Sequence, residues 1–357
     1  MRLCLTGNRK YYIDILKFIA ILSVIFCHLQ LNAESDINVW FIKSGNSFVD
    51  SIWYIFGYIF ANMSIPMFIL LTGANRFRNK EKNFVDYKKL LKEILKIVLI
   101  IIIFQFPFYL YKHIKYGEIF EIKDFLINIY STSVEPIYWY FPGFLIAFLI
   151  AFPLLKRWTL TAEKKDYEYL FVVYAIVSLL INNIAKYFHV AINVPLSIFT
   201  YTYMCPLFGD LICNKYEKDD IKPIRLMILA ICAVSHWLTT EKYEAMNMYL
   251  AMIILILCRY VLEFKVKVNV TKQKAVYNLI TFTAMNALMF YILHPYVLKI
   301  VFKICNYIHL PFGQYAKYPI AIILIIINYV TTYIIVRLYL AFKFEFSKIF
   351  IKIDDTK

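Results

Sequence analysis

Two histidines in apolar surroundings are the residues of this chain best suited to acid–base chemistry. His28 lies near the end of the apolar stretch YYIDILKFIAILSVIFCHLQ, and His294 lies in FYILHPYVL, directly before Pro295. Because an imidazole changes charge near neutral pH, two of them at similar depth are a candidate acid–base or metal constellation. No carboxylate or third histidine completes a ligand set at that depth, so we expect no metal.

Asp14 and Lys17 precede His28 on the same stretch. At about 100° per residue in a helix, Asp14 and Lys17 form an i, i+3 pair, and His28 is turned only about 20° from Lys17. Lys17 and His28 would be about 16 Å apart along the axis. Charged side chains within a membrane span usually face the protein interior or a wet cavity. This shared face therefore either carries chemistry or consists of an interfacial ion pair and a histidine capped by a backbone carbonyl.

The composition indicates the elements that position these residues. Hydrophobic residues make up 61% of the 357 and charged residues 18%, against about 45–50% and about 25% in soluble domains. A soluble core cannot bury that share, and disorder is excluded as well. We predict an all-α polytopic membrane protein, a single domain over 1–357, whose ten transmembrane helices cover 12–31, 49–73, 93–111, 137–155, 168–186, 197–213, 225–239, 247–263, 276–298 and 319–340.

The distribution of basic residues orients these spans. With the N-terminus inside, cytoplasmic segments hold 26 Lys and Arg residues and outer loops hold 8. The positive-inside rule therefore predicts that both termini are cytoplasmic and that the protein lies in the cell (plasma or inner) membrane. The net charge of +15 is explained by this basic rim, so it does not indicate nucleic-acid binding. The seven cysteines are scattered without a CxxC pair and predict neither a disulfide framework nor a zinc site.

Two further groups of residues could bind ligands. The segment after the second span contains Arg76, Arg78, Lys89 and Lys92, which either follow the positive-inside rule or hold the phosphates of an anionic cofactor. Tyr138 and Trp139 open the fourth span. They form an aromatic belt by default, and stacking on carbohydrate is the sharper alternative.

In order along the chain, these motifs resemble those of the acyltransferase-3 family. The first span is similar to that family's opening motif, in which a basic residue, usually arginine, precedes a histidine by ten intervening residues; Lys17 takes that position. SIPMFILLTGANRF, YKKLLKE, YWYFPGFLIAFLIAFPLLK and MFYILHPYVL resemble its later motifs. Lysine replaces arginine at Lys17, Lys89 and Lys92, which removes the planar bidentate fork, and Thr72 replaces a serine but keeps the hydroxyl. The resemblance covers residues 11 to about 340.

The resemblance implies an integral-membrane O-acyltransferase. It would move an acyl group, commonly acetyl, from cytoplasmic acyl-CoA to a hydroxyl of an extracytoplasmic glycan or lipid-linked sugar. His28 would be the general base or would carry the acyl group transiently. Asp14 would pair with Lys17 or position the cofactor, and His294, Trp139 and Tyr138 would shape the acceptor end.

Several alternatives stay open at the level of sequence. A surface-polysaccharide exporter of the same broad family is the main rival, and a sensor or racemase-type membrane module is a weaker one. Expected partners are acyl-CoA, the acceptor sugar and membrane lipids. The sequence does not decide which acyl group or acceptor is used, or whether the protein is a homo-oligomer.

Overall fold

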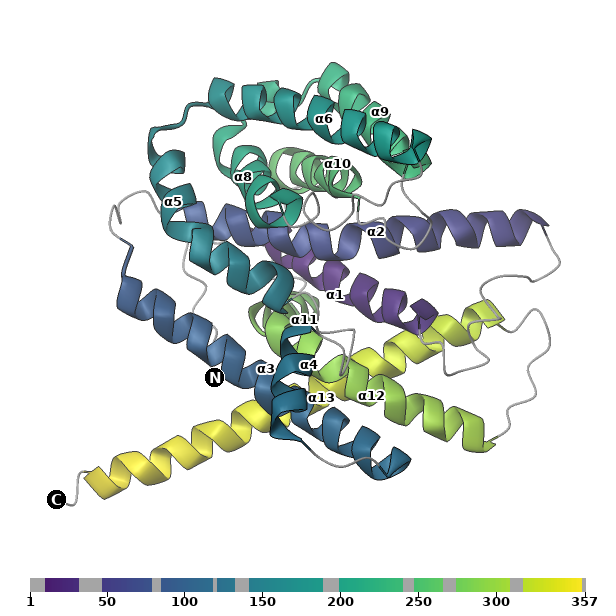
Figure 1. Cartoon of the computed structure of the whole chain (residues 1–357), viewed down its shortest axis with the longest axis vertical. Coiled ribbons are helices and arrows are strands. Elements are labelled where there is room, and N and C mark those ends of the chain that lie inside the picture. Colours follow the sequence, from purple (N-terminus) through teal and green to yellow (C-terminus); the bar gives the residue numbers. More distant parts are fainter. Residues whose placement is uncertain are drawn as a thin grey trace. The chain divides into compact units, whose positions relative to one another are not determined.

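The structure is a computed structural model that describes residues 10–31, 47–78, 85–117, 121–131, 141–188, 199–239, 247–265, 274–308 and 317–354. Every regular element within these ranges is a helix (Figure 1). The chain divides into two compact units, one formed by 1–61 and 269–357 and the other by 62–268. The division falls within helix α2 (Ser47–Phe77).

The first unit places both candidate histidines. It contains the start of α2 and the helices α1 (Tyr11–Leu31), α11 (Lys274–Met285), α12 (Ala287–Ile308) and α13 (Lys317–Asp354). Helix α1 packs against α11, α12 and α13, and α12 packs along α13. The core of this unit includes stacked aromatic rings, such as Phe290 on Tyr329 with 5.5 Å between ring centroids.

The second unit contains the rest of α2 and the remaining helices. In Figure 1, α6 and α9 run side by side, as their contacts require. Four of the segments are π-helical, and two of these are followed directly by an α-helix. The elements are α3 (Tyr87–Tyr116), α4 (Ile122–Ser131), η3 (Phe141–Ile146), α5 (Ala147–Thr161), α6 (Lys164–Tyr187), η4 (Thr200–Met204), α8 (Cys205–Asp210), η5 (Leu211–Lys215), η6 (Lys218–Asp220), α9 (Pro223–Thr239), α10 (Met248–Arg259) and η7 (Tyr260–Lys265).

The all-helical prediction is confirmed for the described residues, and each of the ten predicted ranges lies on one helix or more. Within the described ranges, five helices are long and apolar enough to cross a membrane, or six if a bent pair is one span. Ten crossings and cytoplasmic termini stay predictions. The predicted outer loop 112–135 contains the end of α3 and the short helix α4.

The ninth predicted span, 276–298, is not one straight helix. It is α11 and α12, which meet at Asn286 with a bend of 86°. The backbone N–H of Asn286 donates to the carbonyl of Phe282 (3.1 Å), as in a continuing helix, and its side-chain amide donates to the same carbonyl (2.8 Å). His294 therefore lies within α12, which continues past Pro295, rather than near the end of a span.

A proline in α2 creates a joint with α10. Pro66 has no backbone N–H, so the carbonyl of Asn62, four residues earlier, lacks its usual helical donor. The N–H of Asn247 donates to that carbonyl instead (3.1 Å). The Asn247 side chain also accepts from the N–H of Leu250 and donates to the carbonyl of Ala233. One buried asparagine thus ties three helices together.

Cations and an amide satisfy carbonyls at the ends of buried helices in the second unit. Lys156 donates to the carbonyl of Phe77 (3.3 Å) and Lys215 to that of Ala162 (2.7 Å). Asn214 donates to the carbonyl of Ala74 (2.8 Å), and Arg259 donates to that of Ile212. Donors at these positions supply the hydrogen bonds that helix C-termini lack and complement the negative end of the helix dipole.

These contacts gather the C-terminal ends of α2, α5, η5 and α10 at one end of the second unit. Helices α3 and α6 begin there, because Arg76 pairs with Glu93 and Tyr167 donates to Asp210 (2.5 Å). The predicted alternation of the second to sixth spans agrees with this arrangement. Which side of the membrane this end faces stays a prediction.

An ion-pair network fixes the short turn η6 to α6 and α9. Asp220 accepts from Lys164 (2.5 Å), Arg225 pairs with Glu168 (2.7 Å), and the N–H of Glu217 donates to Asp220 (2.8 Å). Burial opposes ionisation of Asp220, but the Glu217 N–H and the two cations outweigh it and lower the pKa of this carboxyl.

Gly73 and Gly209 allow α2 and the segment of 200–215 to pack backbone against backbone. A Cβ on Gly73 would overlap the backbone of Pro206, and one on Gly209 would overlap the carbonyl of Leu70. We expect Gly73→Ala or Gly209→Ala to lower stability by about 3 kcal/mol, because neither overlap is relieved by a side-chain rotation. Thermal unfolding in detergent checks this. Asn75→Ala, at an exposed position on the same helix, is the matched control and should unfold as the wild type does.

Asp220→Ala should open the η6 turn, because it removes both the cap of Glu217 and the partner of Lys164. We expect backbone hydrogen exchange at Glu217 to be about fivefold faster, with Asp220→Asn, which keeps an acceptor, in between. The wild-type contribution is complete above the pKa of an unfolded aspartate, about 3.9, and is lost as the pH falls through the lower folded value. The Glu163 amide, capped by Asp166 (2.7 Å), serves as the control; equal acceleration there would contradict a local effect.

Candidate active site

The first unit brings the two predicted histidines into direct contact. Nδ1 of His28 on α1 lies 2.6 Å from Nε2 of His294 on α12. The rings are nearly parallel, with 5° between their planes and 4.9 Å between their centroids. His28 is 7% exposed and His294 1%. A pair 266 positions apart in sequence is therefore held as a buried hydrogen-bonded unit.

The backbone of α12 determines which nitrogens carry protons when both rings are neutral. Nδ1 of His294 lies 3.1 Å from the carbonyl oxygen of Phe290. Because a carbonyl can only accept, Nδ1 of His294 must be the donor, and its Nε2 keeps a lone pair. That lone pair accepts the Nδ1–H of His28. The Nε2 atom of His28 is then unprotonated, which is the form that a general base requires.

Asn328 on α13 holds the same segment of α12. Its side-chain N–H donates to the backbone carbonyl of His294 (3.0 Å), and the residue is fully buried. Its Oδ1 atom has no hydrogen-bond partner among the described residues. Sequence reasoning missed Asn328, although an amide within the apolar run IIINYV is costly to bury and could have indicated a role.

Asp14 and Lys17 lie on α1 as predicted but are not part of the histidine contact. Asp14 is buried and Lys17 half-buried. They precede His28 by 14 and 11 residues on one continuous helix, which corresponds to about 21 and about 16 Å of rise. The structure therefore supports a face with charge near one end and an imidazole near the other.

The predicted phosphate-binding residues lie in the second unit in different settings. Arg76 pairs with Glu93 and packs over the ring of Phe152, 5.6 Å from its centroid. Arg78, directly after α2, is exposed. Arg76 is thus partly neutralised, and a planar guanidinium in this position retains further N–H groups for an anion.

The remaining predicted binding residues are Lys89, Lys92, Tyr138 and Trp139. Lys89 and Lys92 are exposed in the first turns of α3, where they are open to an anionic ligand or to lipid. Tyr138 and Trp139 lie outside the described residues. No cluster of metal-ligating side chains occurs in the ranges that the structure describes.

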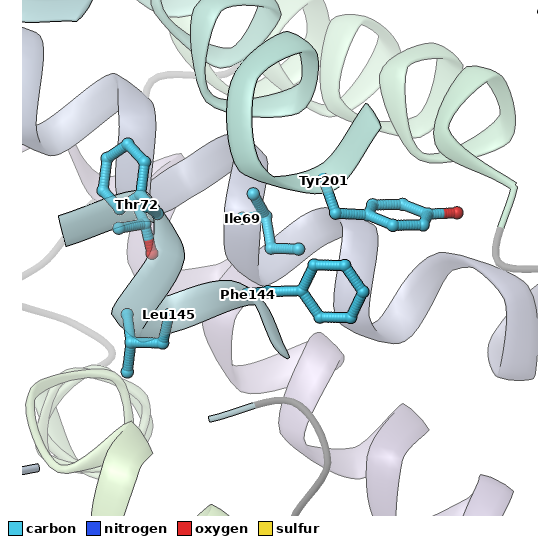
Figure 2. A pocket seen from close by; sticks show the side chains of 6 residues that line it. Ile69, Thr72, Phe144, Leu145 and Tyr201 are labelled. Carbon is cyan, nitrogen blue, oxygen red and sulfur yellow. The ribbon is translucent and has the colours of Figure 1, made fainter. Parts of the chain in front are cut away.

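A small hollow lies between the π-helical segments η3 and η4 of the second unit, beside α2. Figure 2 shows the rings of Phe144 and Tyr201 on one side of Ile69 and the side chains of Thr72 and Leu145 on the other. The empty volume is about 190 Å³ including space open to solvent, with room for about one enclosed water molecule. The hydroxyl of Thr72 donates to the carbonyl of Phe68 (2.7 Å). In this conformation the hollow cannot hold an acyl donor.

Long apolar helices indicate a helical multi-pass membrane protein, and its first unit holds two buried imidazoles in contact. A family model described as an acyltransferase domain matches residues 10–337. The chain belongs to this family, acyltransferase-3, as its motifs predicted, and is therefore a membrane acyltransferase in general terms. No curated protein and no solved structure matches the chain.

Proposed function

We propose that the protein is an O-acyltransferase that moves an acetyl group from cytoplasmic acyl-CoA to a hydroxyl of an extracytoplasmic glycan or lipid-linked sugar, in the cell membrane. The observation that carries this proposal is the buried pair of His28 and His294 in a chain of the acyltransferase-3 family. With Nδ1–H of His28 directed at His294, Nε2 of His28 is free to take a proton.

The reaction proceeds in two proton-coupled steps. Nε2 of His28 takes the proton of the sugar hydroxyl as the oxygen attacks the thioester carbonyl, and a tetrahedral intermediate forms. The carbon–sulfur bond then breaks, the departing sulfur takes the proton from His28, and the donor leaves as a free thiol. His294 holds the imidazolium through Nδ1–H of His28. An acyl-histidine step would use the same nitrogen as nucleophile.

Cations of the second unit would hold the donor. We assign the phosphates of acyl-CoA to Arg76, Arg78 and Lys89, since exposed or partly free cations near one end of this unit offer charge-assisted hydrogen bonds to phosphate oxygens. Asp14 and Lys17 would position the arm of the donor along α1. Trp139 and Tyr138 would stack on the acceptor sugar.

His28→Ala should reduce acylation by about 10² to 10⁴-fold, the contribution of a general base. The measurement is acyl transfer from labelled acetyl-CoA to surface glycan in membranes matched for protein, with mass spectrometry of the product. His236→Ala, which removes a half-buried histidine of α9, is the control and should keep full activity. Unchanged acylation with His28→Ala would refute the proposal, and glycan transport without thioester turnover would favour the exporter.

His294→Gln and His294→Leu separate positioning from packing. Glutamine has a carbonyl that can accept from Nδ1–H of His28, whereas leucine has none. We therefore expect His294→Leu to lose at least tenfold more activity than His294→Gln, with a changed pH–rate profile in both variants. Equal losses and an unchanged profile would mean that His294 only fills space.

Asn328→Leu should displace His294 without changing donor binding. Small displacements of a catalytic group cost large factors in rate, so we expect kcat to fall by about 10 to 100-fold, with little change in KM for acetyl-CoA. Thr331→Val, a half-buried substitution on the same helix, is the control. A rise in KM at constant kcat would place Asn328 at the donor instead.

A further inference from the structure

Helix α3 is the most apolar of the five candidate spans and the least buried. Only 28% of it is covered by the rest of the protein, against 61% for the span on α1. An apolar helix this open to its surroundings is covered by lipid or by another protein, because exposure of such a surface to water is costly.

The first turns of α3 carry two neighbouring strips of exposed side chains. Lys88, Lys92 and Lys96 recur every four residues, and Leu91, Leu95 and Leu99 follow each of them by three. At about 100° per residue the strips run side by side along the helix. The leucines are 56 to 58% exposed, and the lysines are exposed as well. We call these six residues the lysine–leucine face.

The electrostatics of this end of α3 favour an anion. The positive end of the helix dipole lies here, yet the first turn contains no acidic residue. The N-cap Asp86 accepts from the backbone N–H of Lys89 (3.0 Å), and Glu93 pairs with Arg76. Among the described residues, no ion pair joins the side chains of Lys88, Lys92 or Lys96 to an acid. Clustered cations at a helix N-terminus repel one another until a negative group approaches.

We propose that the lysine–leucine face binds an anionic phospholipid of the surrounding membrane. The acyl chains lie along Leu91, Leu95 and Leu99, and the headgroup phosphate is held by the lysines. Lys88 and Lys96 are about 12 Å apart along the axis, and the deeper lysine reaches the headgroup because its long apolar stem lies along the helix.

Lipid fits this face better than acyl-CoA does. Both ligands offer phosphate, but the nucleotide part of acyl-CoA has no chains to cover three exposed leucines. Lys92, which the sequence predicted as a donor contact, therefore belongs to the lipid site. Lys89 and the two arginines of the α2 end remain for the donor, so the lipid site does not depend on the proposed function.

Native mass spectrometry of the full chain tests the proposal, with phosphatidylglycerol and phosphatidylcholine as probes in detergent at low salt. The wild type should retain phosphatidylglycerol preferentially. The triple variant Lys88→Gln/Lys92→Gln/Lys96→Gln should lose this preference, on the order of a hundredfold in affinity, because each cation near a lipid surface contributes about fivefold.

The matched control is Arg157→Gln/Lys218→Gln/Lys222→Gln, which removes three exposed cations elsewhere in the same unit and should keep the preference. Thermal unfolding shows whether each variant is folded, and single lysine variants replace the triple one if it is not. Three results would overturn the proposal: equal retention of both lipids, displacement of phosphatidylglycerol by coenzyme A, or a dimer that excludes lipid from this face.

Discussion

A polar group in the middle of a membrane must find its hydrogen-bond partner within the protein, because lipid chains offer none. Where two long spans break or end, that requirement decides which side chains are tolerated. The carbonyl left by Pro66 has the Asn247 N–H as its donor. The side chain of Asn247 in turn donates to the carbonyl of Ala233, so this buried asparagine occurs where the backbone needs it.

The histidine pair obeys the same constraint, which fixes the protonated nitrogens of both rings. A single buried imidazole could place both of its nitrogens in hydrogen bonds to the backbone. Here the carbonyl of Phe290 uses one nitrogen of His294, and His294 uses one nitrogen of His28. The chain of contacts ends at Nε2 of His28, and in the proposed reaction the acceptor hydroxyl would be its partner. The hydrogen bonds that satisfy the backbone thus give the imidazole of His28 a defined tautomer.

The helices, the family and the two histidines could be predicted from the sequence, because hydrophobic runs and the polar residues within them are local features of the chain. Sequence reasoning did not reach the contact between the two histidines, since nothing in the spacing of 28 and 294 fixes the register of α1 against α12. It also predicted a single span over 276–298, which in the structure consists of two helices at an angle of 86°. No glycine or proline occurs near Asn286, so the sequence gives no local sign of this bend. Asn328 was missed because a lone amide in an apolar run resembles a satisfied packing residue.

The basic residues of the second unit have different roles, so together they do not form one binding site. Lys156, Lys215 and Arg259 donate to helix carbonyls, so their charges serve the fold. The exposed lysines of α3 face outward beside leucines. Arg76, Arg78 and Lys89 remain for the proposed donor, and of these the guanidinium of Arg76 is fixed in place by the ring of Phe152 and by the pairing with Glu93. A fixed planar donor recognises a phosphate more selectively than mobile lysines do. Lys17, Lys89 and Lys92 stand where the family usually has arginine. This departure weakens the resemblance only slightly, because Arg76 supplies a planar cation that its neighbours hold rigidly.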